Sequence, residues 1–296
     1  MQTTPIADCL VIGAGPAGLT AALYLRRYLR SVVVADHGQS RALSIERTWN
    51  FPAFVDGIAG SDLLRRLREQ LAGVQGVVRT GEVTGLRVRP DGGFSADSSG
   101  QTWQARTVLL ATGVVDGVPT LPGTEAVQQR GLLRQCPVCD GYEHRGQRIL
   151  VLGDGPHAAS EAGFLAHYSA QVALVGLNAQ PGATSPGVHR LHVKAAWLEA
   201  LNGGGLRLGL LDGSTQDFDV AYAALKVEPR SQLGRRLGAK VDDCGSLVAD
   251  AHGATSVDGL YAAGDVVSGL DQLIVSASQG AVAATAIHNR LRGATD

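Results

Sequence analysis

Near the N-terminus, the pattern of apolar and polar positions shows two short apolar runs, one before and one after a segment with helical periodicity. Residues 8–12 are mostly apolar and lead into a glycine-rich turn at 13–18. Residues 19–30 are predicted to form a helix, and 31–36 form a second apolar run that ends in an acid. Short apolar runs separated by a helix predict a βαβ unit with parallel strands.

The same order of elements occurs a second time along the chain. An apolar strand over 148–152 enters a glycine turn at 153–158, and a helix and a strand over 171–175 follow. The two copies are in register, because Gly13 and Gly153 are 140 residues apart and later positions match at the same offset. The chain therefore contains an internal repeat of one nucleotide-binding unit.

Three further segments complete the pattern. A glycine-rich stretch over 77–88, with a turn at 90–93, predicts antiparallel strands between the copies. An apolar strand at 107–113 ends in a small-residue turn that suits the floor of a cofactor site. A strand over 259–264 precedes an alanine-rich helix over about 272–291. We expect an α/β fold with two Rossmann-like three-layer nucleotide-binding domains.

Three glycines in the first copy, Gly13, Gly15 and Gly18, form the complete pattern G-x-G-x-x-G. Glycine lets the backbone approach a pyrophosphate at the helix N-terminus, where free N–H groups favour negative charge. Asp36 lies 23 residues after Gly13, where a carboxylate should bind a ribose hydroxyl. These features in register predict a dinucleotide site, and a βαβ turn without a ligand is the weaker alternative.

The second copy keeps the turn and lacks the residues that recognise a nucleotide. Gly153, Gly155 and Ala158 are its candidate NAD(P)H contacts. Gly176 stands 23 residues after Gly153, with neither a carboxylate for NADH nor an arginine cluster for the 2′-phosphate of NADPH. Asp154 also places a carboxylate in the turn, where it would repel a pyrophosphate unless it points away. A βαβ turn with no ligand is a serious alternative here.

Composition narrows the class of protein. With 296 residues, 45% hydrophobic and 18% charged, the chain is typical of a globular enzyme with two domains. Its formal net charge of -1 gives no long-range field for nucleic acid or an anionic membrane. Residues 1–8 lack a signal-peptide pattern and no apolar run reaches bilayer length, so we expect a cytoplasmic protein.

Two of the four cysteines have motif spacing. Cys136 and Cys139 form a C-x-x-C pair, whereas Cys9 lies in an apolar strand and Cys244 lies near a turn. The latter two are expected to be buried or incidental residues. Structural disulfides are rare in the cytoplasm, so a close pair there is more often catalytic or metal-binding.

The residues around the pair favour redox chemistry over metal binding. A zinc site would need two more ligands, and the sequence has no second C-x-x-C, so no metal is expected. An incidental pair of buried cysteines stays open as an alternative. C-x-x-C spacing lowers a thiol pKa toward ~7, which makes the thiolate available for exchange. Asp140 can shuttle a proton to the departing thiolate, and Pro137 restricts the loop. We therefore expect Cys136, Cys139 and Asp140 to be catalytic.

These segments resemble the low-molecular-weight bacterial thioredoxin reductases, which are class II pyridine nucleotide-disulfide oxidoreductases. The resemblance covers nearly the whole chain, in the same order. It rests on the motifs at 13–18, 49–52, 111–113, 136–141 and 263–265, and on Gln272. It implies FAD as the cofactor, held by Gly13, Gly15, Pro16, Ala17, Gly18, Asp36, Arg41, Asn50, Val83, Ala111, Thr112, Gly113, Gly264, Asp265 and Gln272.

The resemblance also implies how the domains are organised. An FAD-binding domain would be formed by residues 1–116 and 245–296, with an NAD(P)H-type domain at 117–244 inserted into it. The family forms homodimers in which Cys139 would contact the flavin and Cys136 would attack the substrate disulfide. A rotation between domains would let nicotinamide and disulfide use the same flavin in turn.

Three positions depart from the family pattern. The histidine-arginine-arginine run expected after Val175 is missing, and the usual glycine-histidine-x-proline loop is replaced at 226–229. Asp271 replaces the arginine before Gln272. The first two departures concern the pyridine nucleotide, so NAD(P)H is an open question while FAD and the disulfide are not affected.

Several functions follow from these observations. The leading one is an FAD-dependent disulfide oxidoreductase that passes electrons between a dinucleotide and the disulfide of a thioredoxin-like protein or a small molecule. The alternatives are a pyridine-nucleotide-independent dithiol oxidase with oxygen as acceptor, and a ferredoxin-fed reductase. A flavin-binding protein without turnover is disfavoured, because binding alone does not require exchange chemistry.

Overall fold

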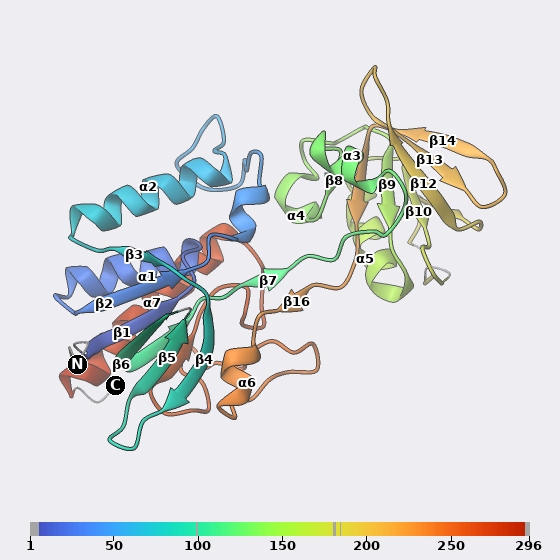
Figure 1. Cartoon of the computed structure of the whole chain (residues 1–296). Helices are drawn as coiled ribbons and strands as arrows, with labels where there is room; N and C mark the ends of the chain where they lie inside the picture. Colours follow the sequence, from blue (N-terminus) through green and yellow to red (C-terminus); the bar gives the residue numbers. More distant parts are fainter. Residues whose placement is uncertain (1–5, 99, 180–181, 184, 294–296) are drawn as a thin grey trace. The chain divides into compact units, whose positions relative to one another are not determined.

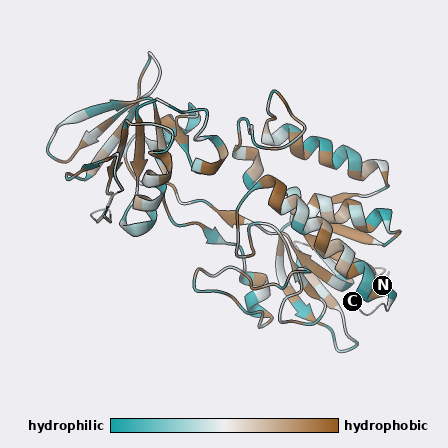
Figure 2. Ribbon diagram, turned by 180° about the vertical axis from the view of Figure 1, so that it is seen from behind, coloured by the Kyte–Doolittle hydropathy of each residue, from teal (hydrophilic) through white to brown (hydrophobic). Residues whose placement is uncertain are grey.

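The computed structural model describes residues 6–98, 100–179, 182–183 and 185–293. The chain divides into two compact units (Figure 1). The outer unit consists of Met1–Val115 and Glu228–Asp296, and the inserted unit consists of Asp116–Val227. In both units the central parallel strands β1, β9, β10 and β15 are largely apolar and buried, whereas strands such as β14 carry hydrophilic residues (Figure 2).

The outer unit is built on a seven-stranded sheet with the strand order β3-β2-β1-β6-β5-β4, and β17 pairs with β6. The strands β1, β2, β3, the C-terminal half of β6, and β17 are parallel, whereas β4 and β5 are antiparallel additions. Their bounds are β1 Ala7–Ile12, β2 Val32–Asp36, β3 Val78–Thr80, β4 Val83–Val88, β5 Phe94–Ser98, β6 Gln101–Leu110 and β17 Leu260–Ala262. The first repeat is therefore the expected βαβ unit.

Helices of the outer unit cover the sheet. They are α1 Pro16–Arg27, η1 Arg41–Ser44, α2 Gly60–Gly73, α6 Gln232–Arg236 and α7 Leu273–Arg292. Helices α1 and α7 pack closely at Gly280, which has no side chain. A Cβ there would lie only 2.2 Å from the Ala17 carbonyl oxygen. Helix α1 ends three residues earlier than expected, and Leu29, with a φ of 60°, reverses the chain soon after it.

The stretch at 77–88 differs in part from the antiparallel expectation. Strand β3 pairs in parallel with β2, and only β4 forms the expected antiparallel hairpin with β5. The two strands belong to different parts of the sheet because the chain turns at Gly81, whose N–H donates to the Asp36 carbonyl at 2.9 Å. This turn brings the start of β4 to the carboxyl end of β2.

The inserted unit has a five-stranded parallel sheet with the order β11-β10-β9-β15-β8 and a three-stranded antiparallel sheet. The elements are α3 Thr124–Gln129, β8 Leu133–Arg134, α4 Pro137–Asp140, β9 Ile149–Leu152, α5 Gly155–Leu165, β10 Val172–Val175, β11 Val188–Leu191, β12 Ala195–Ala200, β13 Leu206–Leu210, β14 Thr215–Phe218 and β15 Val220–Ala223. Alternate residues of β9 pack against α5 on one face and against the small sheet on the other. The second repeat is thus a three-layer Rossmann-like domain.

The second boundary between the units differs from the expected one. The expected inserted domain includes residues 228–244, whereas the structure groups these residues with the outer unit. The strands β7 Val114–Val115 and β16 Glu228–Pro229 pair side by side, and Leu233 is buried in the outer unit's core. A two-residue pairing has no sequence signature, which explains the difference. Among the described residues, no helix is long and apolar enough to cross a membrane.

Candidate active site

The first glycine turn joins β1 to α1 in the outer unit. Gly13 has a φ of 105°, and a Cβ there would lie 2.2 Å from the Ala111 carbonyl oxygen. A Cβ on Gly18 would lie 1.9 Å from the Gly13 oxygen. At Gly15 the nearest contact of an added Cβ would be the Ser40 hydroxyl at 3.3 Å. Packing therefore requires the outer two glycines, and the middle one leaves the backbone open to a ligand.

Helix α1 starts where this turn ends. Its N-cap is Gly15, and no side chain among the described residues caps the helix, so its first N–H groups are available to an anion. Pro16 suits the first helical position because it lacks an N–H and has a helical φ. Ala17 fills the space beside Gly264, where an added Cβ would lie 2.9 Å from the Ala17 Cβ.

Asp36 ends β2 next to the same turn and is only 8% exposed. Its Oδ1 accepts the Ala14 N–H at 3.1 Å, and its Oδ2 pairs with Arg68 at 3.1 Å. A carboxylate keeps further acceptor capacity beyond these two bonds. This geometry matches the position at which a ribose hydroxyl donates to an acid in a dinucleotide site.

The Asp36→Ala substitution should weaken FAD binding by roughly ten- to a hundredfold. The reason is the loss of a charged hydrogen bond of about 1.5–3 kcal/mol at the ribose position. The matched control is Asp62→Ala, because Asp62 forms only an exposed ion pair with Arg65 on α2. Titration of apoprotein with FAD, followed by flavin fluorescence, measures both affinities. Equal affinities in the two variants would remove Asp36 from the site.

A second group of polar residues lies between η1 and the start of α7. Arg41 Nη1 pairs with Asp265 at 3.0 Å and with Asp271 at 3.5 Å. The Ser276 hydroxyl donates to Asp265 Oδ1 at 2.8 Å. Asp271, which departs from the family pattern, therefore forms an ion pair with Arg41. The resemblance implies that Arg41 is one of the FAD-binding residues.

Two further bonds join segments far apart in sequence. The Asn50 side-chain amide donates to Gln272 Oε1 at 2.9 Å, and Gln272 is the N-cap residue of α7. The Gly264 N–H donates to Gln279 Oε1 at 2.7 Å. The structure thus brings together Asn50 and Gln272, which the sequence suggested separately.

The small-residue turn after β6 lies against the first glycine turn. The Ala111 N–H donates to the Ile12 carbonyl at 2.9 Å, and the Thr112 hydroxyl donates to the Arg230 carbonyl at 2.7 Å. The Gly113 carbonyl in turn accepts the Arg230 N–H at 2.9 Å. Val83 starts β4, two residues after the turn that contacts Asp36. Gly13, Asp36, Ala111 and Gly264 therefore lie at the carboxyl ends of the parallel strands β1, β2, β6 and β17, where open α/β sheets bind ligands.

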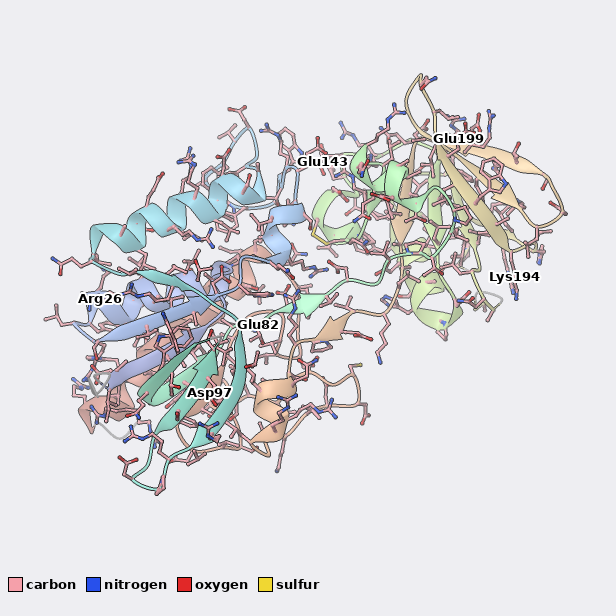
Figure 3. The ribbon with its side chains drawn as sticks, in the orientation of Figure 1. Arg26, Glu82, Asp97, Glu143, Lys194 and Glu199 are labelled. Carbon is pink, nitrogen blue, oxygen red and sulfur yellow. A yellow bond between two sulfur atoms is a disulfide. The ribbon has the colours of Figure 1, made fainter. Side chains whose placement is uncertain are left out.

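The inserted unit contains a disulfide between Cys136 and Cys139, drawn as a yellow bond in Figure 3. The two Cα atoms are 5.3 Å apart, and the Cys139 N–H donates to the Cys136 carbonyl at 3.0 Å. Pro137 occupies the first turn of the short helix α4, where its fixed φ favours the closed loop. Both cysteines are partly exposed, as exchange with a substrate requires.

The remaining cysteines are unsuited to exchange. Cys9 is fully buried in β1, and burial raises the pKa of its thiol to about 12. Cys244 is exposed but has no cysteine partner. Among the described residues, no group of three His, Cys, Asp or Glu side chains could hold a metal ion. The disulfide is therefore the only candidate for redox chemistry by cysteines in this part of the chain.

Asp140 sits in a polar network that the sequence did not predict. The Tyr222 hydroxyl donates to Asp140 Oδ1 at 2.7 Å, and Arg134 Nε lies 3.6 Å from Asp140 Oδ2. Burial raises the pKa of Asp140, and the Tyr222 hydrogen bond, Arg134 and His144 act in the opposite direction. A carboxyl whose pKa is raised keeps its proton to a higher pH than an exposed aspartate does, which suits a group that gives and takes a proton.

In the second glycine turn, the Asp154 carboxylate is hydrogen-bonded to the loop that follows β10. Gly153 is required, because a Cβ there would lie 2.4 Å from the Ala224 oxygen. Asp154 Oδ1 accepts the N–H groups of Leu177 at 2.8 Å and Ala179 at 3.2 Å, and Oδ2 accepts that of Asn178 at 3.1 Å. The carboxylate therefore ties the loop after β10 to the turn, at the position where a ribose would bind.

The side chain of Lys194, which Figure 3 labels, also contacts this loop, and its ammonium donates to the Asn178 carbonyl. Gly155 has a φ of 71° and no atom within 4 Å of an added Cβ, and Ala158 is buried against Gly153. The candidate NAD(P)H contacts thus keep the shape of a nucleotide turn, but the adjoining loop is bonded to Asp154.

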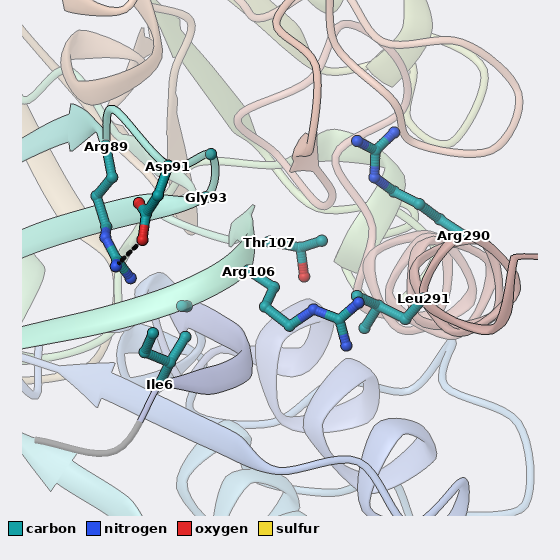
Figure 4. Close-up of a pocket in the computed structure, with 10 residues that line it drawn as sticks. Ile6, Arg89, Asp91, Gly93, Arg106, Thr107, Arg290 and Leu291 are labelled. Atoms are coloured by element: carbon teal, nitrogen blue, oxygen red, sulfur yellow. Dashed lines mark hydrogen bonds and ion pairs between the residues drawn. The ribbon is translucent and has the colours of Figure 1, made fainter.

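A separate pocket of about 450 Å³ lies at the amino end of β1 (Figure 4). It is lined by three arginines, each of which has a carboxylate partner: Arg89 with Asp91, Arg106 with Asp8, and Arg290 with Asp258. Because the charges are compensated and the pocket lies away from the strand ends that carry the predicted site, we do not assign it a role in the chemistry.

Comparison with known proteins identifies the class. Residues 7–281 match the family described as pyridine nucleotide-disulphide oxidoreductase. The chain belongs to this family. Within it, the chain is thioredoxin reductase-like, as the resemblance in sequence indicated.

Two relatives and one solved structure illustrate the similarity. The bifunctional thioredoxin reductase/thioredoxin of Mycobacterium leprae is 34% identical over 96% of this chain and 67% of its own length. The thioredoxin reductase of Mycolicibacterium smegmatis is 31% identical over 93% and 94% of the two chains. The crystal structure of the Streptococcus pyogenes thioredoxin reductase has a TM-score of 0.89 and 26% identity, covering 98% of this chain and 100% of its own.

Family membership and the geometry agree on the cofactor. The protein is an FAD-dependent disulfide oxidoreductase of the thioredoxin reductase-like family. The outer unit's residues fit FAD, because Gly15 leaves the backbone of the first glycine turn open to a ligand and the Asp36 carboxylate lies beside this turn.

Proposed function

We propose that this enzyme exchanges electrons with the disulfide of a thioredoxin-like protein through Cys136 and Cys139. The observation that carries the proposal is the partly exposed disulfide next to the half-buried Asp140, which is bonded to Tyr222. When bound, FAD supplies the two-electron redox chemistry. The cysteines then supply the thiol-disulfide exchange that connects this chemistry to a substrate.

The exchange balances in two steps. The Cys136 thiol passes its proton to Asp140 and attacks one sulfur of the substrate disulfide as a thiolate, which forms a mixed disulfide. The released substrate thiolate takes this proton from Asp140. The Cys139 thiol then passes its own proton to Asp140 and attacks Cys136 Sγ, which closes the observed disulfide and releases the second substrate thiolate to take that proton. Two electrons and two protons pass from the pair to the substrate.

The surface next to the disulfide supports a protein substrate. Val138 lies between the cysteines and is 47% exposed, and Tyr142 is 61% exposed. The Arg145 guanidinium stacks on the Tyr142 ring at 4.4 Å. Exposed aromatic and arginine side chains are enriched in protein interfaces. A small disulfide or dithiol is the alternative substrate.

The outer unit would hold FAD through the strand-end residues described above. We assign the pyrophosphate to Gly13, Gly15, Pro16, Ala17 and Gly18, and the ribose to Asp36. The flavin and its linker would be held by the remaining residues, which are Arg41, Asn50, Val83, Ala111, Thr112, Gly113, Gly264, Asp265 and Gln272. The outer unit is accordingly an FAD-binding domain and the inserted unit an NAD(P)H-type domain.

A second candidate function concerns the electron donor. Because Asp154 occupies the amides of residues 177–179, the inserted unit offers a poor site for a dinucleotide. A dithiol could then reduce Cys136–Cys139, with oxygen as the final acceptor, or ferredoxin could supply electrons. The Asp154 carboxylate is the observation that favours these donors over NAD(P)H.

We predict slow and weak reduction by NADPH and NADH alike. The loss of one charged hydrogen bond at the ribose position weakens binding by roughly ten- to a hundredfold. Stopped-flow reduction of FAD at equal NADPH and NADH concentrations makes the comparison, and Asp154→Gly should improve both donors by removing a like charge. Micromolar affinity for NADPH with strong preference over NADH would contradict this expectation and would point to a distant base such as Arg190.

The proposal extends to assembly and location. We propose a cytoplasmic homodimer, as the resemblance to thioredoxin reductases implies, and sedimentation of the purified protein tests the dimer. The substrate is tested by mixing enzyme, reduced with dithionite, with oxidised thioredoxin or with oxidised glutathione. Faster formation of thiols on thioredoxin supports the protein substrate. Faster reaction of the small disulfide would reverse that choice.

A further inference from the structure

Tyr222 is the only polar side chain that the structure places in one apolar cluster of the described part of the inserted unit. The residue lies in β15, is 0% exposed, and is surrounded by aliphatic residues of β9, β10 and α5. A buried hydroxyl is costly unless it is hydrogen-bonded. Its partner is Asp140 Oδ1, at 2.7 Å, and a phenylalanine would fill the same space without this bond.

The strands explain why the two residues meet. Tyr222 is paired in register with Arg134 of the neighbouring parallel strand β8. The chain passes directly from β8 into the disulfide loop and α4, so Asp140 returns over the two strands. Its carboxylate is then held by Tyr222 on one oxygen and by Arg134 on the other.

His144 and Glu143 are the other titratable residues near Asp140 and Tyr222. His144 follows in the next turn, with its ring 6.1 Å from the Tyr222 ring and its Nδ1 2.8 Å from Gln147 Oε1. Glu143, labelled in Figure 3, lies in the same turn and acts electrostatically on Tyr222. Burial and the nearby Asp140 carboxylate raise the pKa of Tyr222, so its hydroxyl stays protonated and acts as the donor.

We propose that Tyr222 is a positioning residue that holds the Asp140 carboxylate over β8 and β15 and stabilises its ionised form. The inference deepens the proposed function, because it assumes that Asp140 moves the proton in the exchange. Tyr222 itself need not touch the substrate. Its hydroxyl sets how readily Asp140 gives up its proton to a departing thiolate.

The relevant step can be studied with dithiothreitol as the dithiol. Its thiolate attacks Cys136 Sγ and breaks the bond to Cys139, which leaves as a thiolate and takes the proton of Asp140. The second dithiothreitol thiol then passes its proton to Asp140, displaces Cys136 and closes the cyclic disulfide. The Cys136 thiolate takes from solvent a proton that replaces the one the first dithiothreitol thiol lost there. Two electrons and two protons pass from dithiothreitol to the pair.

The test is Tyr222→Phe, with reduction of the pair followed by alkylation of Cys136 and Cys139 and mass spectrometry. Loss of the hydrogen bond should raise the pKa of Asp140, because a bond donated to the carboxylate favours its ionised form. The acid form then persists to higher pH, so the ratio of variant to wild-type rates should rise with pH. The control is Tyr168→Phe, because the Tyr168 ring packs next to Gly141 in the same unit. Its rate ratio should not change with pH.

The Asp140→Asn background separates the possible outcomes. If Asp140 is the proton donor, Asp140→Asn removes this pH dependence, and adding Tyr222→Phe changes nothing further. A rate ratio for Tyr222→Phe that is constant with pH would overturn the inference and leave the role of Asp140 intact. An unaltered pH profile in Asp140→Asn would instead refute the proton role assigned to Asp140. Flavin content and thermal melting verify that each variant folds.

Discussion

Replacement of either Cys136 or Cys139 by serine is expected to reduce disulfide exchange to the uncatalysed background while FAD stays bound. A serine cannot form the disulfide seen between these residues, so one of the two exchange steps has no sulfur to attack or to leave. The cysteines lie in the inserted unit, whereas the residues assigned to FAD lie in the outer unit. The measurement is thiol release from oxidised thioredoxin, together with the ratio of flavin absorbance to protein.

The matched control is Cys244→Ser. Cys244 is exposed and is not part of a disulfide, so its replacement should leave both exchange and flavin content unchanged. Wild-type turnover by Cys136→Ser or Cys139→Ser would remove the pair from the mechanism. Loss of flavin in these variants would instead show that the disulfide is needed for the fold.

The Gly15→Glu substitution is expected to give protein that folds without FAD. An added Cβ at Gly15 would contact the Ser40 hydroxyl at 3.3 Å, so the backbone accepts a side chain with small adjustment. A glutamate carboxylate would then occupy the position of the pyrophosphate at the start of α1 and repel it. Flavin absorbance of the purified variant should fall close to zero.

Two control variants separate the effect of the added charge from the effect of the added side chain on flavin content. Gly15→Ala adds the Cβ without the charge and should keep most of the flavin. Gly73→Glu adds the same charge at the end of α2, where nothing lies within 4 Å of an added Cβ, and should keep all of it. Full flavin content in Gly15→Glu would contradict the assignment of the first glycine turn to FAD.

The sequence was sufficient where chemistry depends on neighbours in the chain. The glycine turn at 13–18 and the C-x-x-C-D segment each put the required residue types within six positions, so their function could be predicted directly. The βαβ repeat was predictable for the same reason, because its apolar periodicity is local. The structure confirmed the two Rossmann-like domains that this repeat indicated.

Features that depend on distant residues were not predictable in this way. Tyr222 and Asp140 are 82 positions apart, and only the parallel pairing of β8 and β15 brings them together. A tyrosine in the otherwise apolar strand 220–223 was the one available signal. The fate of Asp154 was also open, since only the structure shows its carboxylate bonded to the loop after β10. The boundary near 228 depended on the short β7–β16 pairing.

The central claim is that one chain combines FAD with a redox-active Cys136–Cys139 pair, and a reductive titration tests it most directly. Oxidised protein is titrated anaerobically with dithionite while flavin absorbance and free thiols are followed. We predict uptake of about four electrons per chain, two by FAD and two by the disulfide, and about two in the Cys136→Ser/Cys139→Ser double variant. Uptake of about two electrons by the wild type, with no new thiols at Cys136 and Cys139, would contradict it.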